Sequence, residues 1–165
     1  MRRVDRYLDE YAQSHRHPLN QAIHIVCVPL IYFSTLGLAW LIPVGRWIPG
    51  LPVGWQPWIN LASLSLIPQL VFYFRLSAGS ALTGLVWMAI SLAAILAILN
   101  AQLSLLWICA TVWLVSWAVQ FYGHKVEGAK PSFAKDLVFL FIGPLFVSNK
   151  VRRWFAAPAS RPAAG

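Results

Sequence analysis

Residues 76–124 read LSAGSALTGLVWMAISLAAILAILNAQLSLLWICATVWLVSWAVQFYGH and contain no Asp, Glu, Lys or Arg over 49 consecutive positions. As one helix at about 1.5 Å per residue, this stretch would be about 74 Å long. The hydrocarbon core of a bilayer is only about 30 Å thick, so the stretch has to fold back on itself. Asn100-Ala101-Gln102 is its polar break, and we place a tight turn there. The stretch therefore predicts two membrane spans, over about residues 80–99 and 103–121.

The composition of the whole chain also indicates a membrane protein. Hydrophobic residues make up 59% of its 165 positions and charged residues only 11%, whereas soluble domains average about 25% charged. Apolar runs predict two further spans over about residues 21–43 and 57–74, and the loop between them is rich in Gly, Pro and the Trp that favours headgroup depth. We therefore predict an all-α integral membrane bundle of about four transmembrane helices, as one domain over residues 1–155.

The two ends of the chain predict segments that do not span the membrane. Residues 2–13 predict an amphipathic helix at the interface, because Val4, Tyr7, Leu8 and Tyr11 form one apolar stripe. The apolar run at 137–149 is 13 residues long and contains Gly143-Pro144, so we predict a re-entrant or interfacial segment interrupted there. Residues 156–165 are rich in Ala and Pro and predict a disordered tail.

The distribution of positive charge favours one topology. If residues 137–149 do not cross, 12 of the 13 Lys and Arg share one side, and only Arg46 lies opposite; if they cross, the split is 8 to 5. The positive-inside rule then places both termini in the cytoplasm. Anionic lipid accounts for the net charge of +8. Nucleic acid is excluded as a partner because no basic run is interleaved with stacking or base-reading residues.

The four histidines are the residues best suited to chemistry. They are His15, His17, His24 and His124, and the predicted topology brings all four to the same membrane face. Three neutral imidazoles around one ion would leave open positions for substrate and oxygen. Ionisable groups at the edge of a membrane usually have a function. A histidine at a helix end is nevertheless often only an interfacial residue, and both readings stay open at this point.

Polar neighbours are spaced to support these histidines. Asn20 precedes His24 by four residues and Gln120 precedes His124 by four, so each amide lies one helical turn from an imidazole. Glu127 follows His124 by three residues and shares its helix face. A simpler reading is that Glu127 pairs with a nearby lysine, and that Lys125, Lys130 and Lys135 signal topology alone.

Two segments resemble a known family. Residues 11–29 (YAQSHRHPLNQAIHIVCVP) and 120–132 (QFYGHKVEGAKPS), with the closing GPLFV at 143–147, are similar to the yeast 2-hydroxy fatty acid dioxygenase family and its bacterial relatives. The similarity covers about residues 3–153. It implies an Fe(II)-dependent enzyme of fatty acid α-oxidation. Its substrates would be a 2-hydroxy fatty acid and O₂, and its products CO₂ and the fatty acid one carbon shorter.

The resemblance also implies roles for particular residues. The metal ligands implied are His15, His24 and His124. His17 falls where many members have Asn and is not counted as a principal ligand. Among family members, the acidic residue that follows the last histidine varies in its distance from that histidine. Glu127 is therefore a catalytic candidate, either as a metal ligand or as support for a ligand. With these ligands, the residues that we expect to support them or to bind substrate are Asn20, Gln120, Lys125 and Lys130. Asn20 and Gln120 follow from their helical spacing, and Lys125 or Lys130 would steer the substrate carboxylate.

Other functions stay open alongside the dioxygenase. A lipid-binding or scaffold protein would need no metal, and a b-type haem protein would use two axial histidines. A di-iron desaturase would need roughly eight histidines in clustered boxes, and only four are present. The H-K-V-E-G form is similar to the bacterial branch, which implies the bacterial inner membrane, with the endoplasmic reticulum as the alternative. The oligomeric state stays open.

Overall fold

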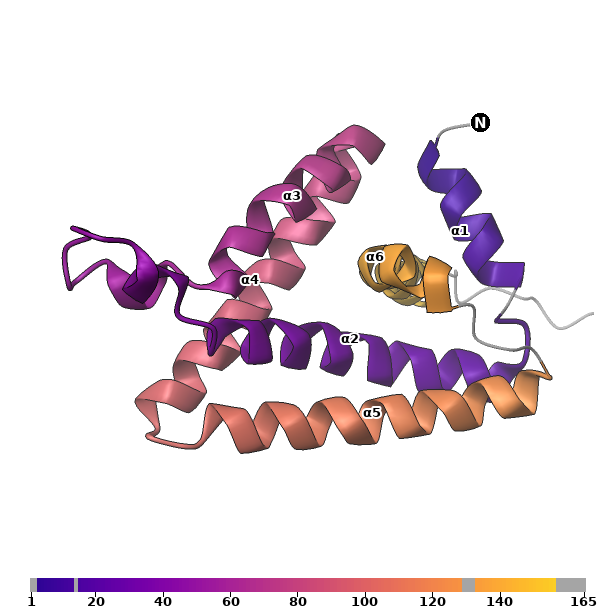
Figure 1. The fold of residues 1–165 in the computed structure, drawn as a ribbon. Helices are drawn as coiled ribbons and strands as arrows, with labels where there is room; N and C mark the ends of the chain where they lie inside the picture. The colour runs from indigo at the N-terminus through magenta and orange to yellow at the C-terminus, as the bar shows by residue number, and fades with distance from the viewer. Residues whose placement is uncertain (1–2, 14, 129–132, 157–165) are drawn as a thin grey trace, which may run out of the picture.

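The computed structural model describes residues 3–13, 15–128 and 133–156, and every regular element in these ranges is helical. The α-helices are α1 (Arg3–Gln13), α2 (Pro18–Trp40), α3 (Leu61–Leu76), α4 (Ala78–Asn100), α5 (Leu105–Glu127) and α6 (Phe133–Ala156) (Figure 1). The loop between α2 and α3 carries two 3₁₀ turns, η1 (Val44–Trp47) and η2 (Gln56–Trp58). The predicted all-α class is confirmed. Lys130 and all but the first residue of the predicted tail lie outside the described residues.

Three described segments are long and apolar enough to cross a membrane: Pro18–Trp47, which contains α2, and the helices α4 and α5. The remaining apolar helix, α3, has 16 residues and is about 24 Å long, short of the hydrocarbon core. It begins at Leu61 rather than near residue 57 because Asn60 caps it. Asn60 Oδ1 accepts the Ser63 N–H, and Ser63 Oγ accepts the Asn60 N–H. The prediction of about four spans thus becomes three long helices and one shorter one.

The helices pack as two antiparallel pairs, α2 with α5 and α3 with α4 (Figure 1). Where the end of α2 meets the start of α5, a Cβ built on Gly37 would lie 2.3 Å from Cys109 Sγ. Small residues at helix contacts allow the close approach that drives association in lipid. On the outer surface, large apolar side chains such as Leu82, Ile67 and Leu114 are exposed. Such surface suits hydrocarbon better than water.

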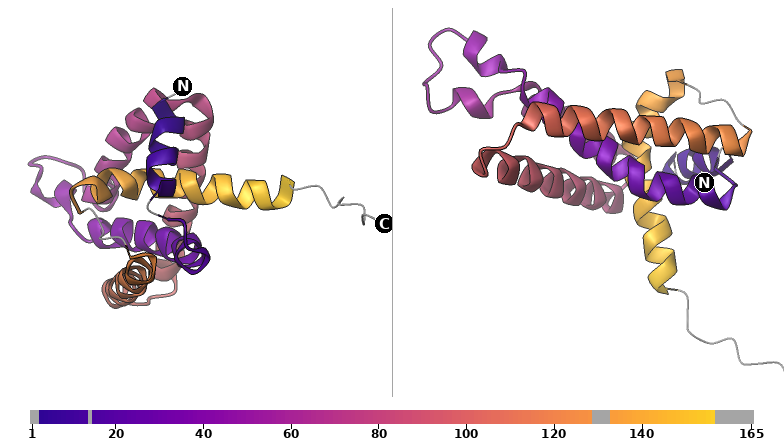
Figure 2. Two further views of the ribbon diagram at one scale, coloured as in Figure 1. Left: turned by 90° about the vertical axis from the view of Figure 1, so that its right-hand side faces the viewer. Right: turned by 90° about the horizontal axis from the view of Figure 1, so that it is seen from below.

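Helix α6 differs from its prediction in length and continuity. It has 24 residues and continues through Gly143 and Pro144 instead of being interrupted there. Proline removes one backbone hydrogen bond, but residues 142–147 are all buried, and a Cβ on Gly143 would lie 2.7 Å from Val28 Cγ1. This packing against α2 offsets the lost hydrogen bond. Figure 2 shows α6 running across α2 and α5 rather than along them. Its placement at the membrane interface stays a prediction.

Side-chain hydrogen bonds fix α6 against the α3–α4 pair. The Tyr73 hydroxyl of α3 donates to the Phe141 carbonyl at 2.8 Å, and Trp87 Nε1 of α4 donates to Ser148 Oγ at 2.9 Å. Tyr73 is completely buried. Because buried polar groups without partners are costly in an apolar setting, these bonds select one position for α6.

Gly84 offers a direct test of this packing. A Cβ at Gly84 would lie 2.3 Å from Cδ2 of the Tyr73 ring, which its hydroxyl holds in place. Alanine normally stabilises a helix relative to glycine by about 1 kcal/mol, yet we expect Gly84→Ala to destabilise the protein by about 1–3 kcal/mol through overpacking. Gly79→Ala in the same helix is the control, since its nearest neighbour is 3.9 Å away. In thermal unfolding measured in detergent, we expect a lower midpoint temperature for Gly84→Ala but not for Gly79→Ala. Equal midpoints for the two variants would contradict the packing described.

Candidate metal centre

His15 lies in the elbow between α1 and α2 and is buried. Its ring stacks on Tyr11, with centroids 4.1 Å apart and planes within 4°. Its Nδ1 lies 2.6 Å from the Tyr11 carbonyl oxygen. Because a carbonyl only accepts, Nδ1 carries the proton and Nε2 carries the lone pair. Burial lowers the pKa of His15 to about 4, so its imidazole is neutral at neutral pH.

His24 repeats this arrangement in the second turn of α2. It is 2% exposed, and its Nδ1 donates to the Asn20 carbonyl at 2.9 Å, which again leaves Nε2 with the lone pair. Asn20 is itself fully buried beside α5. A Cβ on Gly123 would lie 2.5 Å from Asn20 Oδ1, so glycine at this position lets α5 approach the start of α2.

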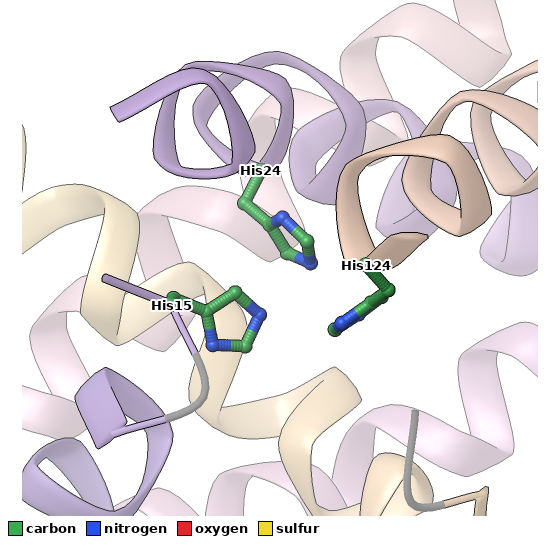
Figure 3. Close-up of side chains that lie close together, drawn as sticks. All are labelled: His15, His24 and His124. Carbon is green, nitrogen blue, oxygen red and sulfur yellow. The ribbon is translucent and has the colours of Figure 1, made fainter. Parts of the chain in front are cut away.

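His124 completes the cluster from the last turns of α5. It is half-buried, and its Nδ1 has no hydrogen-bond partner among the described residues; neither has Nε2 of His15. The three rings point toward one another (Figure 3). Centroid separations are 4.1 Å for His15 and His24, 5.0 Å for His24 and His124, and 5.3 Å for His15 and His124. One nitrogen from each ring lies within 4.8 Å of the others.

The donor set fits a transition-metal ion. Imidazole nitrogens bind such ions at about 2.1 Å, so the rings would need to move closer by about an ångström. His15 and His24 each donate the other ring N–H to a backbone carbonyl, the hydrogen bond that usually orients histidine ligands. The buried, unpartnered Nε2 of His15 is the atom expected to face an ion. Three ligands leave coordination positions open, as catalytic metal sites require.

Glu127 closes the site from the end of α5 without joining the imidazole cluster. Its Oε1 accepts the Arg16 N–H at 2.8 Å, and its Oε2 accepts the His17 N–H at 2.9 Å and Asn20 Nδ2 at 3.1 Å. A carboxylate at the start of α2 is also favoured by the helix dipole. Gly128, with φ of 74°, ends α5 directly after this residue. The carboxylate therefore holds the backbone next to His15 against the helix that carries His124.

Gln120, Lys125 and His17 do not belong to the three-histidine cluster. Gln120 is buried one turn before His124, and Lys125 is exposed. His17 is exposed and caps α2, with its Nδ1 accepting the Leu19 N–H at 3.2 Å. The structure gives His17 a role in starting the helix, which does not need a metal.

Sequence reasoning missed three side chains that contribute to the site, Tyr11, Phe146 and Lys150. Tyr11 covers one face of His15, and Phe146 of α6 packs on Tyr11 with a centroid separation of 4.7 Å. Lys150, also on α6, donates to the side chain of Gln21 on α2. The i, i+4 spacing of Tyr11 and His15 could have indicated the first contact. No local pattern indicates the contact between Gln21 and Lys150, since these residues are 129 positions apart.

These observations define a class: a helical protein whose described residues include three helices able to span a membrane and a largely buried three-histidine cluster able to hold a metal ion. Residues 1–154 match the family described as 2-hydroxy-palmitic acid dioxygenase Mpo1-like, and the chain belongs to this family. The resemblance seen in the two histidine segments is thereby confirmed. No curated protein and no solved structure matches the chain.

Proposed function

We propose that the protein is an Fe(II)-dependent dioxygenase that shortens 2-hydroxy long-chain fatty acids by one carbon. The substrates are the 2-hydroxy acid and O₂, and the products are the shortened acid, CO₂ and water. The reaction balances without an added reductant, because oxidation of C1 and C2 supplies the four electrons that O₂ accepts. The observation that carries the proposal is the meeting of His15, His24 and His124 in a member of the Mpo1-like family.

The residues of the chain have separable tasks in this proposal. His15, His24 and His124 would hold the ion, and the Tyr11 and Asn20 carbonyls keep two of the rings in the tautomer that can ligate. Glu127 maintains the distance between the elbow and α5. Tyr11 and Phe146 form a dry wall beside His15. When bound, the iron would supply a chelating position for the hydroxy acid and activate O₂.

The geometry favours a single non-haem ion over the haem alternative. The three rings lie 4.1–5.3 Å apart at steep interplanar angles, and this spacing leaves no room for a macrocycle between any two of them. Lys and Arg near α1, the α3–α4 turn and α6 would place this end of the bundle on the cytoplasmic side. We propose the bacterial inner membrane, where lipid would present the acyl chain directly to the site.

The test is an assay combined with metal analysis. Protein purified without chelator and loaded with Fe(II) is expected to convert 2-hydroxypalmitate under air to the fifteen-carbon acid, with one CO₂ released per O₂ consumed. Palmitate, which lacks the 2-hydroxyl, should not react. Treatment with a chelator should abolish turnover, and Fe(II) should restore it. Turnover that persists in fully metal-free protein would contradict the proposal.

A further inference from the structure

A pocket of about 400 Å³, lined by both polar and apolar side chains, lies next to His15. Its wall is built by α1, the elbow, the start of α2 and α6, and includes Leu8, Asp9, His15, Arg16, Phe146 and Lys150. His24 and His124 are not in this wall. His15 is therefore the residue that the pocket and the candidate metal centre share.

Lys150 brings a half-buried positive charge into this pocket. Its Nζ donates to Gln21 Oε1 and lies 5.8 Å from the centroid of the Phe146 ring. Both partners are uncharged, and among the described residues no carboxylate is paired with this ammonium. An ammonium group has three N–H donors, so one bond to Gln21 leaves others for a ligand. A partly desolvated cation without a counter-ion favours binding of an anion.

Gln21 ties this cation to the metal centre. Its Nε2 donates to the His15 carbonyl at 2.7 Å and lies 3.4 Å from the Arg16 carbonyl. Its Oε1 accepts from Lys150. One amide thus holds the ammonium against the same elbow that carries the His15 ring. The cation and the candidate ligand are positioned together rather than independently.

The other groups in the wall suit the head of an acidic lipid. Arg16 adds a second, exposed cation, and Asp9 is the acidic residue in the wall, also exposed. Leu8 and Phe146 supply apolar surface next to the charges. A carboxylate attached to an alkyl chain matches this combination. Lys125, one of the two lysines that the sequence analysis offered for steering the carboxylate, is exposed and does not line the pocket.

Resting on the proposed function, we infer that Lys150, held by Gln21, receives the substrate carboxylate in this pocket. One oxygen of the substrate carboxylate accepts a hydrogen bond from the Lys150 ammonium, and the 2-hydroxyl group of the substrate lies toward His15. This contact selects 2-hydroxy acids over uncharged lipids that carry the same hydroxyl group.

The test measures binding to metal-free protein in nanodiscs of zwitterionic lipid, with radiolabelled 2-hydroxypalmitate and with 1,2-hexadecanediol, its uncharged analogue. Loss of a charge-assisted hydrogen bond should weaken acid binding to Lys150→Gln by about 10-fold or more and leave diol binding unchanged. Lys150→Arg should recover most of the acid affinity. Arg152→Gln is the matched control, because Arg152 is exposed on the same helix and donates to Asn149. It should bind the acid as the wild type does.

Several outcomes would overturn the inference. These are equal binding of acid and diol by the wild type, unchanged acid binding by Lys150→Gln, or an equal loss with Lys125→Gln. If Lys150→Gln does not fold, judged by circular dichroism, Gln21→Met provides the same test by releasing the ammonium from the elbow. Wild-type protein that binds the acid through Lys150 but does not cleave it would reject the proposed reaction and retain the pocket. If the wild-type protein cleaves the acid and Lys150→Gln leaves its KM unchanged, the role of Lys150 is rejected and the proposed reaction is retained.

Discussion

Replacing His124 with alanine is expected to reduce bound metal from about one ion per chain to a trace and to lower turnover by more than about 100-fold. Changes to groups that only support a ligand already cost about 10–100-fold, and loss of one of three ligands removes more. His124 is the member of the three-histidine cluster that α5 contributes, so the variant leaves the ion with imidazoles from the elbow and α2 alone. Metal content by mass spectrometry of the purified protein and turnover of 2-hydroxypalmitate are the two measurements.

The control for this variant is His17→Asn. His17 lies in the same elbow as His15, but its side chain caps α2, and asparagine caps a helix equally well. We expect metal content and turnover close to those of the wild type. Full activity in a folded His124→Ala protein, or loss of metal in His17→Asn, would contradict the ligand assignment.

Glu127→Gln is expected to weaken metal affinity by about 10–100-fold while leaving helix content unchanged. The carboxylate accepts three hydrogen bonds from the elbow and from Asn20. A glutamine amide has one acceptor oxygen, so at least one of these donors loses its partner and the position of His15 is less well defined. Titration of metal-free protein with Fe(II) measures the effect.

The same titration separates a positioning role for Glu127 from a ligand role. If Glu127 only positions the elbow, saturating Fe(II) should restore most of the turnover of Glu127→Gln, whereas His124→Ala should stay inactive at any iron concentration. Turnover that does not recover at saturating iron would indicate that this carboxylate ligates the ion. An unchanged metal affinity would show that the contact contributes to stability alone.

The fold was predictable where the signal is local. The uncharged stretch and its break at Asn100–Gln102 locate α4 and α5, and Gln102 does adopt a positive φ of 56° at the turn. The stripe of apolar residues locates α1. The course of α6 was not predictable, because the residues that keep it helical through Pro144 lie on other helices. Val28 packs against Gly143, and Tyr73 bonds to the Phe141 carbonyl.

The candidate site was predictable in its members but not in its construction. Topology alone was enough to bring His15, His24 and His124 to one end of the bundle, and the structure places them together; their role as ligands stays a prediction. The contacts of Glu127 with backbone N–H groups about 110 residues away leave no trace in sequence spacing. Lys150 was counted only as a charge for topology. Its contact with Gln21 depends on how α6 crosses α2.

X-ray absorption at the iron edge tests the central claim most directly, because it counts the imidazoles around the ion. For the Fe(II)-loaded wild-type protein we expect one ion per chain with three imidazole nitrogens at about 2.1 Å, and a smaller imidazole count or no bound iron in His24→Ala. Wild-type protein that takes up no stoichiometric iron, or a spectrum with no imidazole contribution, would show that the three rings do not form a metal site.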